Sequence, residues 1–184
     1  MPPKPNARTG FAVLLTGLSG AGKSTVAEEL LRRWTPQREV TVLDGDVVRT
    51  MLSQGLSFSR EDRDLNILRI GWVAAEVVRH GGAVIIAAIA PYDGAREQAR
   101  VMVEAYGVFG LVHLSTPLEV CEARDVKGLY ARARAGEIGS FTGISDPYEL
   151  PAHPDVVIDT SQLPVEASAD AIEAYLRLRG IGLH

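Results

Sequence analysis

The sequence predicts a single α/β domain with a parallel sheet covered by helices on both faces. Five strand-like apolar runs alternate with six segments of helical pattern, and this alternation is typical of that fold class. The run from Ala83 to Ile89 is continuously apolar, as expected for a central strand that is covered on both sides. The chain has 184 residues, of which 46% are hydrophobic, which is enough for one core and little for two domains.

The expected elements follow one another along the chain without repeats or linkers. Residues 1–10 are expected to form a flexible N-terminal tail, and residues 11–184 a single domain. Gly81 and Gly82 end the helix that precedes the central strand. Strands are expected at 11–16, 40–43, 83–89, 108–114 and 155–159. Helices are expected at 23–34, 46–53, 61–80, 93–106, 117–124 and 164–179.

A glycine-rich pattern, G-x-x-x-x-G-K-[S/T], lies between the first strand and the first helix. Glycines in such a turn let successive backbone N–H groups curl around an anion, and the helix N-terminus adds partial positive charge. Lys23 can reach the outer phosphates, and the Ser24 hydroxyl can bind Mg²⁺. The alternative is a glycine-rich turn without a nucleotide. The expected triphosphate-binding residues are Gly17, Leu18, Ser19, Gly20, Ala21, Gly22, Lys23, Ser24 and Thr25.

Two carboxylates and an arginine follow the second strand, in the run L-D-G-D-V-V-R. In open α/β sheets, ligands bind at the carboxyl edge of the strands. Asp46 is the candidate to accept or orient the proton of an alcohol acceptor, and Asp44 to act near the metal through water. Arg49 belongs to the same group. The alternative is that Asp46 merely caps a helix beginning at Val47.

The next polar group lies in F-S-R-E-D-R-D-L-N, where Ser59 has the pattern of a helix N-cap and Asp62 follows at the capping-box position. Arg63 and Asn66 are three residues apart and share one helix face. Arginine suits bidentate binding of phosphate or sulfate, and Phe58 can stack on a base. Spacing alone equally allows a solvated charged face with one buried phenylalanine.

Residues 125–150 are rich in Arg, Gly, Asp and Pro and show little periodic hydrophobic signal. So long a connection is usually functional or disordered, and three aromatic side chains argue against disorder. We expect a mobile lid that closes over bound substrates. Lys127, one of only three lysines, lies near its start, although a surface lysine without a role is the alternative. A basic group on a lid can stabilise the charge of a transferring phosphate in the closed state.

Composition excludes several other classes of function. The net charge of −4 gives no basic footprint for nucleic acid. The single cysteine, Cys121, cannot form an intramolecular disulfide and suits a reducing cytosol. No apolar stretch approaches the roughly 20 residues that span a bilayer, and the N-terminus lacks the apolar core of a signal peptide. Four histidines show no ligand spacing. We therefore expect a cytoplasmic protein without a membrane segment or a metal cluster.

Five segments between about residues 11 and 160 together resemble the adenylylsulfate kinases, which phosphorylate the 3′-hydroxyl of adenosine 5′-phosphosulfate with MgATP. They are G-L-S-G-A-G-K-S-T, L-D-G-D-x-x-R, F-S-x-x-D-R-x-x-N-I-x-R-I-G, P-L-E-V-C-E-x-R-D-V-K-G-L-Y-x-x-A-R-A-G-E-I and F-T-G-I-x-D-P-Y-E. The last two are highly specific for the family. The resemblance implies a P-loop kinase fold with a five-stranded parallel sheet, usually as a dimer.

The resemblance also implies roles for particular residues. Phe58 and Phe141 are similar to the pair that sandwiches the acceptor's adenine, and Lys127 matches a lid lysine near the transferring phosphate. Arg124 and the stretch around Thr160 resemble the wall of the ATP adenine site. The residues implied to bind the phosphosulfate are Arg49, Arg63 and Asn66. The remaining acceptor contacts are expected at Ile89, Ala90 and Ser140.

The chain departs from the family pattern at three positions. Ala90 stands where the family usually has a serine, so no phosphorylated intermediate can form there and phosphate must pass directly from ATP to the acceptor. Ser57 replaces a glycine and is expected to stiffen its loop slightly. Ser145 replaces an aspartate in a way that sequence alone does not interpret.

The sequence therefore predicts an adenylylsulfate kinase that makes 3′-phosphoadenosine 5′-phosphosulfate and ADP. Its catalytic residues are Asp46, Lys23 and Lys127, its cofactor is Mg²⁺, and its partners are ATP and adenosine 5′-phosphosulfate. Another small-molecule kinase and a catalytically weakened nucleotide-binding subunit are the alternatives, and a GTPase is disfavoured because no N-K-x-D segment is present. A homodimer is expected. Association with a sulfurylase and the fate of the product stay open.

Overall fold

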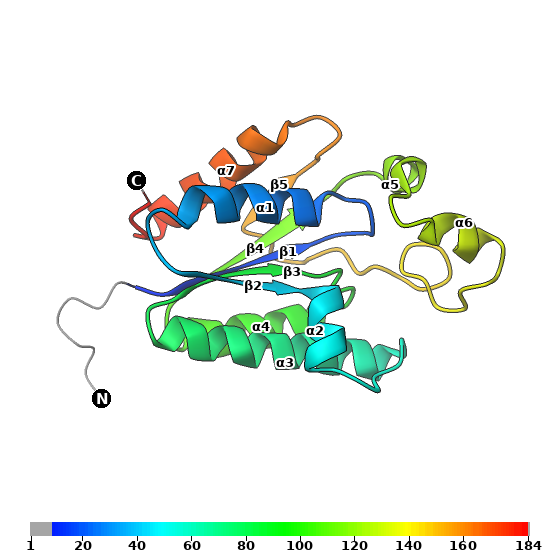
Figure 1. Cartoon of the computed structure of the whole chain (residues 1–184), viewed down its shortest axis with the longest axis horizontal. Coiled ribbons are helices and arrows are strands. Elements are labelled where there is room, and N and C mark those ends of the chain that lie inside the picture. Colours follow the sequence, from blue (N-terminus) through cyan, green and yellow to red (C-terminus); the bar gives the residue numbers. More distant parts are fainter. Residues whose placement is uncertain (1–8, 184) are drawn as a thin grey trace.

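The computed structural model describes residues 9–183 as an α/β domain with one five-stranded parallel sheet (Figure 1). The strand order is β2-β3-β1-β4-β5. Most of the predicted N-terminal tail, residues 1–8, lies outside the described residues, as does His184. The strands are β1 (Phe11–Thr16), β2 (Val40–Asp44), β3 (Ala83–Ala87), β4 (Val108–Leu114) and β5 (Val156–Ile158). All five predicted strands are present, and the predicted fold class is confirmed.

Helices cover both faces of the sheet, as predicted. In Figure 1, α1 and α7 lie above the sheet and α3 and α4 below it, while α5 and α6 lie beyond the carboxyl ends of the strands. Six helices correspond to predicted ones, and α6 forms inside the segment expected to be a lid. The helices are α1 (Lys23–Trp34), α2 (Gly45–Met51), α3 (Arg60–Arg79), α4 (Asp93–Glu104), α5 (Leu118–Arg124), α6 (Leu129–Arg134) and α7 (Val165–Leu178).

The central strand β1 joins the two halves of the core. All six of its residues are buried, and it pairs with β3 on one side and β4 on the other. Because successive side chains of a strand point to opposite faces, Phe11, Val13 and Leu15 pack with the core under α1 and α7. Ala12 and Leu14 pack with the core under α3 and α4. The single strand β1 therefore contributes side chains to the core on both faces of the sheet.

Strand β3 ends at Ala87, two residues earlier than the apolar run predicts. The backbone of Ala90 has φ of 47°, in the left-handed region, so the chain bends out of the sheet plane. Thr16 holds this bend, because its hydroxyl donates to the Ile89 carbonyl at 2.5 Å. Arg96 holds it as well, with Nη1 donating to the Ala90 carbonyl at 2.6 Å. Residues 88–90 thus form a fixed turn at the carboxyl edge.

Two helix caps lie next to the polar groups found in the sequence. Ser59 caps α3 as predicted, accepting from the Asp62 N–H at 3.2 Å. The Asp62 carboxylate accepts from the Ser57 N–H at 2.7 Å and from the Ser57 hydroxyl at 2.5 Å. These two hydrogen bonds restrain the loop at Ser57, in agreement with the stiffening expected there. The cap of α2 is Asp44, which accepts from the N–H groups of Asp46 and Val47. The capping role considered for Asp46 is therefore wrong.

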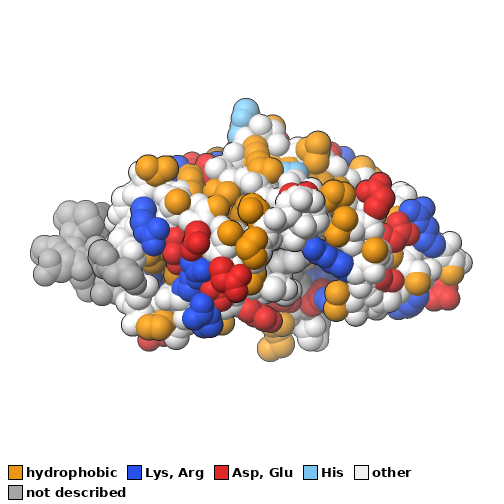
Figure 2. Space-filling model, turned by 90° about the horizontal axis from the view of Figure 1, so that it is seen from above, with side chains coloured by type: hydrophobic (Ala, Val, Ile, Leu, Met, Phe, Trp, Pro, Cys, Tyr) orange, Lys and Arg blue, Asp and Glu red, His pale blue; other side chains and the backbone are white. Residues whose placement is uncertain are grey.

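The surface over α1 and α7 carries acidic and basic side chains side by side, with no extended patch of one sign (Figure 2). Arg33 of α1, for example, pairs with Glu29 at 2.7 Å and with Asp170 of α7 at 2.6 Å. This mixture matches the small net charge of the chain. Among residues 9–183 no helix has both the length and the apolar character required to cross a membrane.

Close packing at the N-terminal edge of the sheet predicts a large effect for Gly107→Ala. A Cβ at position 107 would lie 2.2 Å from the Gly10 carbonyl oxygen, which also accepts from the Val108 N–H. We expect the melting temperature to fall by about 4–8 °C, because overpacking costs about 2 kcal/mol. Gly94→Ala is the matched control, since nothing lies within 4 Å of its Cβ position. Thermal unfolding of the two variants checks this, and equal melting temperatures would contradict it.

Candidate active site

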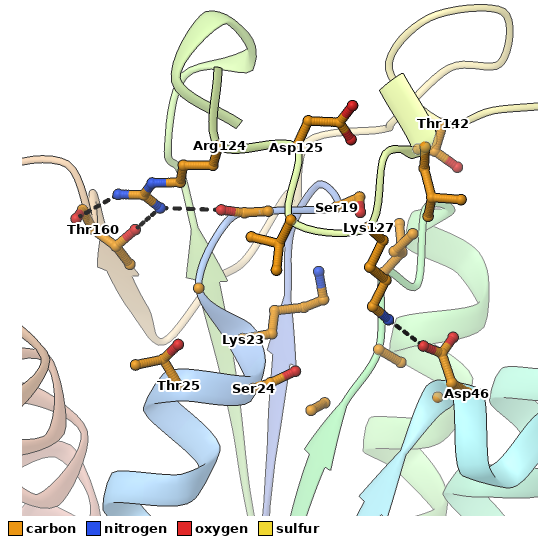
Figure 3. Close-up of a pocket in the computed structure, with 18 of the residues that line it drawn as sticks. Ser19, Lys23, Ser24, Thr25, Asp46, Arg124, Asp125, Lys127, Thr142 and Thr160 are labelled. Atoms are coloured by element: carbon orange, nitrogen blue, oxygen red, sulfur yellow. Dashed lines mark hydrogen bonds and ion pairs between the residues drawn. The ribbon is translucent and has the colours of Figure 1, made fainter. Parts of the chain in front are cut away.

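A cavity of about 950 Å³ lies at the carboxyl edge of the sheet, under α6 and the loops around it (Figure 3). Its volume is at the upper end of the range for small-molecule sites. Both the phosphate-binding loop (residues 17–24) and the lid segment (residues 125–150) contribute to its wall. The predicted site residues that line it are Ser19, Gly20, Gly22, Lys23, Ser24, Thr25, Asp46, Phe58, Arg63, Ile89, Arg124, Lys127, Ser140, Phe141 and Thr160.

The phosphate-binding loop is shaped by glycines in the left-handed region. Gly20 has φ of 77°, and a Cβ there would lie 2.9 Å from the Cys121 carbonyl oxygen. Gly22 has φ of 94° and is the N-cap of α1, without a side chain that caps the helix. The first N–H groups of α1 are therefore not capped by a side chain, and they give the loop an anion-binding end.

Lys23 lies folded against the loop that precedes it. Its Nζ donates to the carbonyl oxygens of Gly17 at 2.9 Å and Leu18 at 2.7 Å. Burial lowers the pKa of Lys23 to about 8. Neutral carbonyls compensate its charge only in part, and an anion in the loop would stabilise the charged ammonium. The side chain is thus prepared for a phosphate ligand.

Asp46 and Lys127 form an ion pair across the mouth of the cavity (Figure 3). Asp46 lies in the first turn of α2, and Lys127 lies at the start of the lid segment, 81 residues later. The hydrogen bond with Asp46 raises the pKa of Lys127. Both side chains are largely exposed, so the pair is accessible to substrates. The structure therefore brings two of the predicted catalytic groups into direct contact.

One end of the cavity is closed by Arg124 and Thr160. Arg124 Nη1 donates to the Gly20 carbonyl at 3.0 Å and to the Thr160 hydroxyl at 2.9 Å, and Nη2 donates to the Thr160 carbonyl at 3.1 Å. These bonds tie the phosphate-binding loop to the segment after β5. The start of α7 completes this wall. The sequence did not predict this part of the site, although the segment follows the carboxyl end of a strand. Its residues are Leu163, Pro164, Val165 and Ser168.

The opposite end of the cavity carries the two predicted aromatic residues. The Phe58 side chain is 58% exposed, and the Arg49 guanidinium carbon lies 4.6 Å from its ring centroid. Phe141 is buried and packs edge-on against Tyr130, with ring centroids 5.0 Å apart. Both phenylalanines line the cavity, so they lie at one site although 83 positions separate them in the chain.

Arg63 and Asn66 are both buried, contrary to a solvated charged face. Arg63 donates to the Phe58 and Ser140 carbonyls, the Thr142 hydroxyl and the Asp146 carboxylate. The Oδ1 atom of Asn66 has no hydrogen-bond partner among residues 9–183.

Several predicted site residues do not line the cavity itself. Ala90 is 2% exposed, and the neighbouring wall is formed by Ala87, Ala88 and Ile89. The hydroxyl of a serine at position 90 would therefore be attached to a buried residue that does not line the cavity. The predicted residues that do not line the cavity are Gly17, Leu18, Ala21, Asp44, Arg49, Asn66 and Ala90.

The lid segment is folded against the site, and its two halves are held differently. Residues 125–139 contact the site through the Lys127–Asp46 pair and through the Tyr130 hydroxyl, which donates to the Ser19 carbonyl at 2.9 Å. Residues 140–150 are held by buried arginines, among them Arg96, whose Nη2 donates to the Glu149 carbonyl at 2.7 Å. The mobility of the segment stays a prediction.

Comparisons with known proteins agree with this geometry. Residues 9–159 match the family model described as adenylylsulphate kinase. The chain is 50% identical to the adenylyl-sulfate kinase of Myxococcus xanthus, with 94% of each protein covered. It is 48% identical to the sulfate adenylyltransferase of Neurospora crassa, a match that covers 96% of this chain and 31% of the Neurospora protein.

A solved structure shows the same likeness in three dimensions. The APS kinase of Mycobacterium tuberculosis, in complex with AMPPNP and APS, superposes with a TM-score of 0.88 at 40% identity. The superposition covers 92% of this chain and 99% of the Mycobacterium chain. From its sequence, its fold and the arrangement of its cavity, this chain belongs to the adenylylsulfate kinase family.

Proposed function

We propose that this chain transfers the γ-phosphoryl group of ATP to the 3′-hydroxyl of adenosine 5′-phosphosulfate, giving 3′-phosphoadenosine 5′-phosphosulfate and ADP. The observation that carries the proposal is the single cavity that joins the two ends described above. One end holds the phosphate-binding loop with Lys23, and the other holds Phe58 and Phe141. Asp46 and Lys127 line the same cavity and pair with each other, so they are available where a donor and an acceptor would meet.

The donor end fits a nucleoside triphosphate. The uncapped N-terminus of α1 and Lys23 would hold the β- and γ-phosphates, and the wall of Arg124, Thr160 and the start of α7 would enclose the base. Mg²⁺ fits beside Ser24, an exposed residue whose hydroxyl can supply one of the oxygen ligands that this ion requires. Asp44 caps α2 through Oδ1, which leaves Oδ2 for a contact through water. The bound ion would neutralise charge on the phosphates.

At the acceptor end, the two phenylalanines would stack on the adenine and place the 3′-hydroxyl near Asp46. The 3′-oxygen attacks the γ-phosphorus, the bond to the bridging oxygen of ADP breaks, and the hydroxyl proton passes to Asp46. Lys127 pairs with Asp46 before substrates bind, so it must leave that carboxylate as the acceptor arrives. It would then place its charge near the transferring phosphate.

Three further features are part of the proposal. The exposed side chains of Leu65 and Trp72 on α3 fit a homodimer, which the resemblance also implies. A sulfurylase partner is suggested by the Neurospora relative, in which a similar segment is part of a longer sulfate adenylyltransferase. A cytoplasmic location is supported by the buried free thiol of Cys121.

ADP release with adenylylsulfate as acceptor tests the function. We expect turnover with adenylylsulfate and none above background with nucleosides or sugars, because only the first acceptor offers both an adenine for the aromatic pair and an anion for the arginines. Binding of both nucleotides without turnover would instead indicate a regulatory subunit. Turnover only with another acceptor would indicate a different small-molecule kinase.

Replacing Asp46 by asparagine keeps the shape of the side chain and removes its basicity. We expect kcat to fall by about 10²–10⁴-fold, the usual contribution of a general base, with ATP affinity unchanged within about twofold. Lys127→Ala also breaks the ion pair but leaves the Asp46 carboxylate in place, and its kcat should fall as well because Lys127 is proposed to act on the transferring phosphate. A near-wild-type kcat for Asp46→Asn would exclude Asp46 as the base.

The buried position of Ala90 predicts that Ala90→Ser has little effect. Since the side chain lies outside the cavity wall, kcat should stay within about twofold of wild type. No phosphoprotein should accumulate when the variant is incubated with γ-labelled ATP. A labelled, catalytically competent phosphoserine would contradict direct transfer, and thermal unfolding separates any change in stability from a change in chemistry.

A further inference from the structure

The hydroxyl of Thr16 is the meeting point of three chain segments beside the cavity. Thr16 is the last residue of β1, and it is fully buried. Its Oγ1 donates to the Ile89 carbonyl at 2.5 Å, in the turn that follows β3. The same oxygen lies 2.9 Å from the phenol oxygen of Tyr148, in the segment 140–150. One hydroxyl therefore joins the strand that leads into the phosphate-binding loop to two parts of the acceptor end.

The directions of these hydrogen bonds follow from the atoms that take part. A carbonyl oxygen can only accept, so the single hydroxyl hydrogen of Thr16 is used on the turn at Ile89. Thr16 Oγ1 must then accept from the Tyr148 phenol. Burial raises the pKa of Tyr148, so the phenol keeps its proton at neutral pH. Donation therefore runs from Tyr148 to Thr16 and from Thr16 to Ile89.

Thr16 continues the connection between β1 and β3 beyond the point where the two strands are paired. Their register ends at Leu15 and Ala87, and one backbone bond follows, from the Ala88 N–H to the Leu15 carbonyl at 3.2 Å. The chain then bends away, with φ of 47° at Ala90. A left-handed conformation is unfavourable for a residue with a Cβ, so the turn needs support from its surroundings. Thr16 provides that support from β1.

The groups next to this hydroxyl lead directly to the two ends of the cavity. The carbonyl of Gly17, the residue after Thr16, accepts from Lys23 Nζ at 2.9 Å. Ile89 lines the cavity wall. Neither Thr16 nor Tyr148 lines the cavity itself. A change at either hydroxyl therefore acts on bound substrates only through the loop and the wall that it holds.

We propose that Thr16, supported by Tyr148, is a positioning residue that holds the phosphate-binding loop in place relative to the acceptor wall at Ile89. The inference rests on the proposed function, in which a phosphoryl group passes directly between these two parts. Direct transfer requires the attacking oxygen to be aligned with the phosphorus, and a misplacement of about 1 Å can cost about a hundredfold in rate. The role therefore predicts a loss of kcat that exceeds any loss of affinity.

Thr16→Val removes the hydroxyl and keeps the branched shape of the side chain. We expect kcat with ATP and adenylylsulfate to fall by about 10–100-fold, because the two ends of the cavity lose their alignment. The Kd of ADP, and that of adenylylsulfate with ADP in excess, should stay within about threefold of wild type, because each end keeps its own contacts. Thr16→Ser restores the hydroxyl and should return kcat to within about threefold of wild type.

A purely structural role of Thr16 gives a different result. The unpaired carbonyl and phenol would then lower the melting temperature of Thr16→Val and leave its kcat unchanged. That outcome would overturn the proposal, as would a Thr16→Ser variant with the same low kcat as Thr16→Val. All rates are measured well below the melting temperature of each variant, so that only folded protein is compared.

Tyr148→Phe is a second and milder test, because it removes only the phenol donor. The ring can stay stacked on His113 of β4, where the centroids lie 5.8 Å apart. We expect kcat to fall by about 3–10-fold, the factor that corresponds to one hydrogen bond of ordinary strength. Added to Thr16→Val, the change should cause little further loss, because the phenol has already lost its acceptor. Losses that multiply would contradict a common route through Thr16. If Thr16→Val does not fold, an unchanged kcat in Tyr148→Phe overturns the proposal by itself.

Tyr175→Phe is the matched control for the loss of a partly buried phenol. The Tyr175 hydroxyl donates to the Phe109 carbonyl at 2.7 Å, near the amino end of β4 and so at the opposite edge of the sheet from the cavity. Its kcat should stay within about twofold of wild type, even where the melting temperature falls. A loss equal to that of Tyr148→Phe would show that turnover responds to general destabilisation, and it would overturn the proposal.

The outcomes also separate this inference from the proposed function. If the wild type phosphorylates adenylylsulfate and Thr16→Val has the same kcat, only the positioning role fails. If the wild type phosphorylates a different alcohol, the proposed function fails, and a 10–100-fold lower kcat of Thr16→Val with that acceptor still supports the positioning role. A wild type that transfers phosphate to no acceptor would overturn both.

Discussion

The parallel pairing of β1 with β3 and β4 is the constraint on which the site depends. In-register parallel pairing from Phe11 onward brings the carboxyl ends of these strands to one edge. The phosphate-binding loop leaves β1 at that edge, the turn at residues 88–90 leaves β3, and Asp44 ends the neighbouring β2. Because every inward residue of β1 is fully buried, a shift in its register would expose core side chains on both faces.

A second constraint is the burial of two arginines beside this edge. Arg63 and Arg96 are both more than nine-tenths buried, and each donates to two carbonyls and to one carboxylate. Burying such charges is costly unless they are paired and hydrogen-bonded, so these contacts must form together. They hold residues 140–150 in place, while residues 125–139 are held through the buried side chains of Tyr130 and Ala133. The fold therefore fixes residues 140–150 beside the cavity, while the mobility of the lid segment stays a prediction.

Some helices and strands could be located from the sequence and others could not, and the reasons are physical. Strands and helices with strong periodicity were located within a few residues, and the glycine pattern located the loop between β1 and α1 correctly, because these features depend on neighbouring residues. The end of β3 was placed too late, since the apolar run continues while the backbone bends at Ala90. The helix α6 was missed because its six residues lie in a segment without an apolar period.

The sequence by itself determined most of the elements, the glycine-rich loop and the residue types that can carry the chemistry. Only the tertiary structure decided which of those residues still have free donors and acceptors. Arg63 and Arg49 are alike in sequence, yet three bonds of Arg63 reach partners 77 to 83 residues away, while Arg49 bonds only eight residues away. Such partners depend on how distant segments pack, and no local pattern encodes that choice. The Lys127–Asp46 pair and the buried side chain of Ala90 were decided in the same way.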